Sequence, residues 1–170
     1  GMGIAVSALV GRYVGARKPG SAERATWTAA GLSFGYMVVC GLVYVLFPRA
    51  LLAPYALRAD PVAFAPIEEI AVVLLRFVAL YSIFDVMNVI FSSAVKGAGD
   101  TRFPLYAATL AGLFVLVLPT WFVTTHLGGG WLAAFWCATA YVAAVGIAML
   151  VRFRAGRWKS MSVIDAEAPG

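Results

Sequence analysis

The chain has 170 residues, of which 62% are hydrophobic and only 12% are charged. A mean hydropathy of +0.89 and long apolar blocks exclude an ordinary soluble domain, which carries about twice that charged fraction. The net charge of +5 comes from basic residues beside the apolar blocks, so we expect them to anchor helix ends and predict no binding of nucleic acid.

The composition predicts an all-α integral membrane bundle of five transmembrane helices. Their apolar blocks are residues 1–16, 25–47, 70–95, 104–126 and 131–152. The first block is short for a span of about 20 residues. Pro104 suits the first turn of the fourth helix, and Pro119 should kink that helix or free a carbonyl group. Residues 1–153 are predicted to form the bundle, and residues 154–170 a cytoplasmic tail.

The alternate connections of this bundle are rich in basic residues. They follow the first, third and fifth blocks, and they contain Arg12, Arg17, Lys18, Arg24, Lys96, Arg102, Arg152, Arg154, Arg157 and Lys159. The positive-inside rule predicts a multi-pass protein of the inner or plasma membrane with a cytoplasmic C-terminus. Since Gly1 would then lie outside the membrane in mid-helix, we expect a piece of a longer protein. A native five-helix protein that starts at Met2 is the alternative.

Asp85 lies in the middle of the third apolar block, where a carboxylate is costly. At about 100° per residue, a polar stripe within about 60° of Asp85 contains Tyr81, Ser82, Asn88, Ser92 and Lys96. Such a stripe should face the bundle interior or a water-filled cavity, which makes Asp85 a candidate to bind Na⁺ or a proton. A structural Asp85, hydrogen-bonded to a neighbouring helix, is the alternative. Arg76 falls on the opposite face and should snorkel to the outer interface.

Other features predict packing and membrane anchoring. Gly11 with Gly15, and Gly31 with Gly35, form small-xxx-small pairs that favour close helix packing. Most of the tryptophans near block ends are interpreted as interface anchors. We find no nucleophile–base set, phosphate-binding loop or metal cluster in the sequence, and therefore predict no enzyme and no cofactor apart from a coupling ion.

Two stretches carry a more specific signal. The stretch ALVGRYVGARKPGSAERA, residues 8–25, contains G-x-x-x-G-A followed by a short polar loop and A-x-R. The stretch LYSIFDVMNVIFSSAVKGAGDTRFP, residues 80–104, ends in a pattern close to lrGaGdtr-P. The first resembles a helix end and cytoplasmic loop of the multidrug and toxic compound extrusion (MATE) transporters, and the second resembles their tenth helix and the loop after it.

The resemblance implies a twelve-helix transporter with two six-helix lobes and cytoplasmic termini. This chain would supply helices eight to twelve, and its partners would be the N-terminal lobe and the seventh helix. In members with a cation site in this lobe, an Asp on the tenth helix takes part in Na⁺ or H⁺ coupling. Asp85 matches it by its offset from KGAGD. Tyr81, Asn88 and Ser92 are candidates to line the site by geometry alone.

The function implied is multidrug efflux, with organic and often cationic compounds exported from a cavity between the lobes in exchange for Na⁺ or H⁺. Two alternatives stay open. One is a related flippase of lipid-linked precursors, and the other is a non-transporting membrane fragment that acts only by helix assembly. Membrane lipid is a partner in each case.

Overall fold

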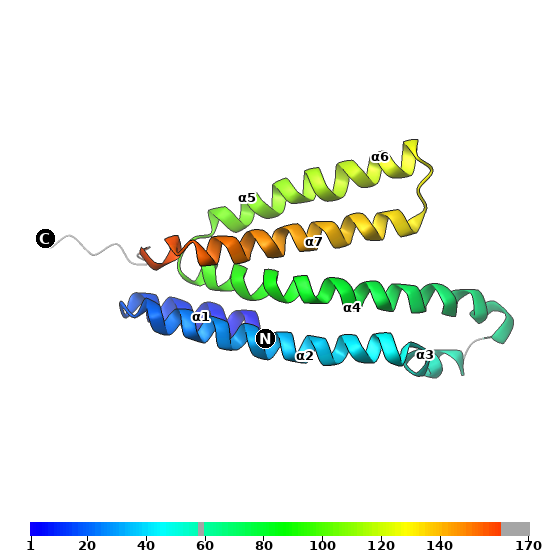
Figure 1. The fold of residues 1–170 in the computed structure, drawn as a ribbon, viewed down its shortest axis with the longest axis horizontal. Helices are drawn as coiled ribbons and strands as arrows, with labels where there is room; N and C mark the ends of the chain where they lie inside the picture. The colour runs from blue at the N-terminus through cyan, green and yellow to red at the C-terminus, as the bar shows by residue number, and fades with distance from the viewer. Residues whose placement is uncertain (58–59, 161–170) are drawn as a thin grey trace, which may run out of the picture.

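The structure, a computed structural model, describes residues 1–57 and 60–160. The last ten residues of the predicted tail lie outside the described residues. The helices in chain order are α1 (Met2–Gly15), α2 (Pro19–Leu46), α3 (Pro48–Ala56), α4 (Pro61–Gly97), α5 (Arg102–Ala111), the π-helix η1 (Gly112–Val117), α6 (Leu118–His126), α7 (Trp131–Arg154) and the 3₁₀ turn η2 (Arg157–Ser160). The long helices run side by side along the long axis of the molecule (Figure 1).

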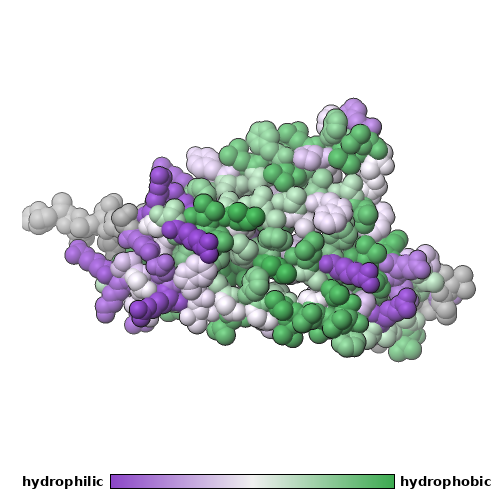
Figure 2. Space-filling model, viewed as in Figure 1, coloured by the Kyte–Doolittle hydropathy of each residue, from purple (hydrophilic) through white to green (hydrophobic). Residues whose placement is uncertain are grey.

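Four helical stretches of the described chain are long and apolar enough to cross a membrane. They are Pro19–Leu46, Phe64–Gly97, Arg102–His126 and Trp131–Arg154. Helix α1 has 14 residues and is shorter than the roughly 20 residues of a full span. Hydrophobic side chains cover the middle of the molecule, and hydrophilic ones gather at its two ends (Figure 2). The prediction of an α-helical membrane bundle is confirmed, with four full-length spans where five were expected.

Helix α4 is the centre of the bundle and packs against α7, α2 and α1 (Figure 1). The best-buried side chains of α4, including Ile90, Ala94 and Val95, lie in the half of the helix nearest Gly97. There α1 approaches so closely that a Cβ on Gly11 would lie 3.0 Å from the Gly97 carbonyl oxygen. The predicted close packing is therefore confirmed at Gly11 but not at Gly15, where a Cβ would meet no atom within 4 Å.

The glycines of α2 behave differently from Gly11. A Cβ on Gly31 or Gly35 would meet no atom within 4 Å. The prediction of close packing was wrong for this pair, because α2 leaves a hollow between itself and α4 at that level. A small-xxx-small pattern marks a face where a helix can approach closely, and only tertiary contacts decide whether one does.

Residues 48–69 were expected to be a connection, but most of them are helical. Helix α3 begins at Pro48 and α4 at Pro61, and proline is favoured in a first helical turn because its fixed φ suits the helix and its missing N–H has no intrahelical partner. Glu68 and Glu69 lie directly before the apolar block at residues 70–95 and lower the hydropathy there. They do not interrupt α4, since Glu is a good helix former. Helix α4 therefore begins well before the block at residues 70–95.

The fourth span is irregular where Pro119 predicted it. The π-helix η1 separates α5 from α6 and ends two residues before Pro119. Proline cannot donate to the carbonyl group four residues earlier, and a wider helical turn accommodates that loss. A π segment of this kind is a local departure from the α ladder inside a membrane span, and α7 packs directly against it.

Candidate functional site

Asp85 lies near the middle of the apolar part of α4. Arg76 is the only charged residue between Glu69 and Asp85, and Lys96 is the next charged residue after Asp85. At 1.5 Å per residue, Arg76 and Lys96 are roughly 30 Å apart along the helix, which is the thickness of the hydrocarbon core of a bilayer. Because Asp85 lies about midway between them, this spacing places it near the bilayer midplane.

The Asp85 side chain is half-buried, and within the described residues it makes no hydrogen bond and no ion pair. Its neighbour Ser82 donates to the Val78 carbonyl oxygen at 2.6 Å and so uses its hydroxyl within α4. Helix α7 crosses α4 at this turn, because a Cβ on Gly146 would lie only 2.6 Å from the Phe84 carbonyl oxygen. Asp85 is thus an unpaired carboxylate beside a close approach of α4 and α7.

A polar cavity of about 290 Å³ begins one helical turn from Asp85, between α4, α5 and α7. Its polar side chains are Asn88, Ser92, Ser93, Lys96 and Tyr141. Two of the predicted site residues, Asn88 and Ser92, therefore lie together at one cavity, whereas Tyr81 and Asp85 do not line it. Amide and hydroxyl oxygens are ligands that hard cations accept. The described residues hold no group of three or more His, Cys, Asp or Glu side chains that could bind a metal ion.

An apolar hollow of about 530 Å³ lies between α2, α4 and α7. Its larger side chains are those of Trp27, Phe34, Met87, Phe91 and Leu150. The Trp27 and Phe91 rings meet edge to face, with their centroids 5.2 Å apart. Gly31 and Gly35 also line this hollow, which explains the open space beside them. Its aromatic walls suit a flat apolar molecule.

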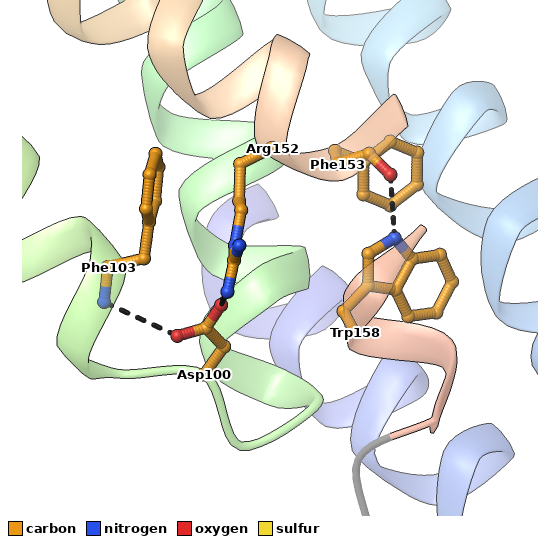
Figure 3. A network of polar contacts seen from close by, with 5 residues as sticks. All are labelled: Asp100, Phe103, Arg152, Phe153 and Trp158. Carbon is orange, nitrogen blue, oxygen red and sulfur yellow. Dashed lines mark hydrogen bonds and ion pairs between the residues drawn. The ribbon is translucent and has the colours of Figure 1, made fainter. Parts of the chain in front are cut away.

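An ion pair that the sequence analysis missed joins the α4–α5 loop to α7 (Figure 3). Arg152 donates from Nε at 2.8 Å and from Nη2 at 2.6 Å to Asp100 Oδ2. Asp100 Oδ1 accepts from the Phe103 backbone N–H at 3.3 Å, and the guanidinium lies 4.8 Å from the centre of the Phe103 ring. The Asp100 and Arg152 side chains are only 5% and 17% exposed. We call this group the Asp100–Arg152 clasp.

Trp158 closes the same end of the bundle. Its indole N–H donates to the Phe153 carbonyl oxygen at 2.8 Å. The Trp158 and Phe153 rings stack, with their centroids 5.0 Å apart (Figure 3). The tryptophan is 1% exposed, so it is a packed residue of the bundle and not an interface anchor. Nearby, Lys159 and Glu23 form a more exposed ion pair at 2.6 Å between η2 and α2.

These apolar spans, with a single carboxylate between the two basic residues of α4, define a polytopic α-helical membrane protein. The MatE family matches residues 1–123, and the chain belongs to that family. It is 35% identical to the multidrug resistance protein NorM of Burkholderia vietnamiensis over 97% of this chain and 35% of that protein. It is 33% identical to a probable multidrug resistance protein NorM of Mesorhizobium japonicum over 78% of this chain and 29% of that protein.

A more distant relative is a probable multidrug resistance protein NorM of Deinococcus radiodurans, 29% identical over 92% of this chain and 36% of that protein. The chain spans about a third of the length of these curated relatives. No solved structure matches the chain.

Proposed function

We propose that this chain forms part of a secondary active antiporter that exports organic, often cationic, compounds in exchange for Na⁺ or H⁺. Membership of the MatE family supports a transporter, and relatives named as multidrug resistance proteins support this class of substrate. In this proposal the chain supplies helices eight to twelve, and an N-terminal lobe and a seventh helix complete the translocation pathway.

The observation that carries the coupling role is the unpaired Asp85 carboxylate one turn from the polar cavity. An ionised carboxylate near the midplane is costly unless a cation neutralises it, so its charge depends on whether Na⁺ or a proton is bound. If the outward-facing and inward-facing forms bind that cation with different affinities, its binding shifts the equilibrium between them. Asn88 and Ser92 would hold water or part of the ion shell, and Tyr81 would lie along the same face.

The positions of the basic residues support a cytoplasmic C-terminus. The Asp100–Arg152 clasp and the Lys159–Glu23 pair bring the α1–α2 connection, the α4–α5 loop and the end of α7 to one end of the bundle. These are the segments rich in Lys and Arg, and the positive-inside rule assigns such an end to the cytoplasm.

Asp85→Asn is the test of the coupling role. The protein that carries this chain would be reconstituted into liposomes, and export of a fluorescent organic cation would be driven by an imposed Na⁺ or pH gradient. We expect gradient-driven export to fall roughly 5- to 150-fold, the usual range of coupling between two ligand sites. Exchange of substrate across the membrane without a gradient should persist. Glu23→Gln, which removes a carboxylate at the bundle surface, is the matched control and should leave export unchanged.

Unchanged gradient-driven export by Asp85→Asn would remove the coupling role from this residue. If neither the wild-type protein nor Asp85→Asn moves organic cations, but the wild-type protein moves lipid-linked precursors across the bilayer, the flippase interpretation replaces the antiporter.

A further inference from the structure

Three adjoining hollows lie along α2, α3 and α4 and lead to the end of the bundle opposite the Asp100–Arg152 clasp. An apolar groove of about 310 Å³ lies between α2 and α4 and is lined mainly by side chains such as Met37, Leu42 and Leu80. A second hollow, of about 360 Å³, lies between the α2–α3 junction and α4. A third, of about 260 Å³, lies between α3 and the first turns of α4. Arg76 lines the first two hollows and Arg49 the last two, so the three form one continuous track.

The chemistry of the track changes in a fixed order. The groove is apolar up to Arg76, which has no ion-pair partner in the described part of the chain and is exposed. Arg49 follows in the second hollow, loosely paired with Glu68 at 3.6 Å and 82% exposed. Glu68 and Glu69 line the third hollow. The lining of the track is therefore first apolar, then cationic and then acidic.

The depth of the track agrees with this order. Arg76 lies roughly 30 Å along α4 from Lys96, so it sits at a boundary of the hydrocarbon core. Helix α2 ends at Leu46 at the same level, since Val45 and Leu46 line hollows together with Arg76. The apolar groove then faces the acyl chains, and the two hollows beyond Arg76 face the lipid headgroups.

We propose that this track binds one phospholipid whose headgroup carries both a phosphate and a primary ammonium, as in phosphatidylethanolamine. An acyl chain lies in the groove between α2 and α4, and the Arg76 guanidinium donates to the phosphate, with Arg49 beside it. The ammonium donates to the carboxylates of Glu68 and Glu69. A guanidinium presents its N–H donors in a planar fork that matches phosphate oxygens. The carboxylates disfavour a lipid that is only anionic, because they repel added negative charge.

The test is native mass spectrometry of the detergent-purified protein that carries this chain. Phosphatidylethanolamine, phosphatidylglycerol and phosphatidylcholine with identical acyl chains would be added in equal amounts. We expect one tightly retained phosphatidylethanolamine. Arg76→Gln should weaken its retention about tenfold, as expected for loss of a charge-assisted hydrogen bond, and Glu69→Gln should reduce the preference over phosphatidylglycerol. Arg24→Gln, which removes an exposed arginine at the other end of α2, should change neither.

Arg76→Lys keeps the charge without the fork and should retain lipid at an intermediate level, which covers the case in which Arg76→Gln does not fold. Equal retention of the three lipids, or equal retention by Arg76→Gln and Arg24→Gln, would show ordinary annular lipid and overturn the proposal. A protein that retains no phospholipid would also overturn the proposal. Displacement of the lipid by water-soluble glycerophosphoethanolamine would overturn the role of the apolar groove.

Discussion

The two ends of the bundle are built in different ways. At the end that holds the α4–α5 loop and the end of α7, which we call the clasped end, Val95 and Ala98 are fully buried and Phe153 is 1% exposed. At the open end, which holds the α2–α3 junction and the α6–α7 loop, Phe47 is 59% and Leu127 is 67% exposed. The buried ion pair and the most deeply buried side chains lie at the first end, whereas the second end has the exposed Arg49–Glu68 pair and the hollows beside it.

This contrast gives Asp85 a particular position. It lies between the two ends, beside the turn where Gly146 brings α7 close to α4. We expect the helices to keep their arrangement at the clasped end, because breaking a buried charge pair costs several kcal/mol. We therefore expect a change of charge at Asp85 to change mainly the positions of the halves of α4 and α7 that lead to the open end.

Removing one member of the clasp should have the largest effect on stability. Asp100→Asn leaves the Arg152 guanidinium without its carboxylate in a site where Asp100 is 5% exposed. We expect a loss of about 3–5 kcal/mol, because an uncompensated buried charge remains. Denaturant unfolding in detergent, followed by circular dichroism, measures the change. A loss no larger than that for breaking the exposed Lys159–Glu23 pair at the same end would show that the clasp does not stabilise this end of the bundle.

Gly146→Ala should have the next largest effect. Its new methyl group would lie 2.6 Å from the Phe84 carbonyl oxygen, so α7 must move away from α4, at a cost of about 1–3 kcal/mol for overpacking. Gly31→Ala is the matched control, because its methyl group enters open space and Ala is favoured over Gly in a helix by up to about 1 kcal/mol. Equal unfolding midpoints for the two variants would contradict the close crossing at Asp85.

Trp158→Phe keeps a ring to stack on Phe153 but removes the indole N–H that donates to the Phe153 carbonyl oxygen. The expected loss is about 0.5–1.5 kcal/mol, the usual contribution of one hydrogen bond. Thermal unfolding compared with Trp121→Phe checks it, since Trp121 is 58% exposed. A larger loss for Trp121→Phe would place the stabilising contacts outside the clasped end.

The smallest effect is expected for Lys159→Gln. The Lys159 and Glu23 side chains are 39% and 38% exposed, and such pairs contribute about 0–1 kcal/mol because water and salt screen them. The free energy of unfolding of wild-type protein and Lys159→Gln, measured at low and at high salt, should differ by less than about 1 kcal/mol. A loss as large as that of Asp100→Asn would mean that this pair, and not the clasp, holds the end together.

The sequence predicted the elements that depend on local chemistry. Apolar blocks located the long helices because hydropathy over about 20 residues reports membrane spans directly, and Pro119 correctly indicated the irregular fourth span. The length of α4 was underestimated because Glu68 and Glu69 lower hydropathy without lowering helix propensity. The contrast between Gly11 and Gly31 depends on which helix lies opposite, which a single sequence does not reveal.

The site was predicted in the same partial way. A polar stripe at helical spacing brought Asn88 and Ser92 to one cavity. The Asp100–Arg152 clasp was missed because its members are 52 residues apart, and because basic residues near helix ends had already been assigned to orientation. The available signal was that Asp100 is the only acidic residue in the basic α4–α5 loop, where an arginine partner could be expected. The coupling role of Asp85 stays a prediction.

The most direct test of that role measures ion release on substrate binding. The protein that carries this chain would be loaded with ²²Na⁺, or held in weakly buffered detergent solution with a pH indicator, and an organic cation substrate would be added. Because coupling between two ligands is reciprocal, we expect the wild-type protein to release Na⁺ or a proton and Asp85→Asn to release neither while still binding substrate. Equal release by both proteins would contradict the account.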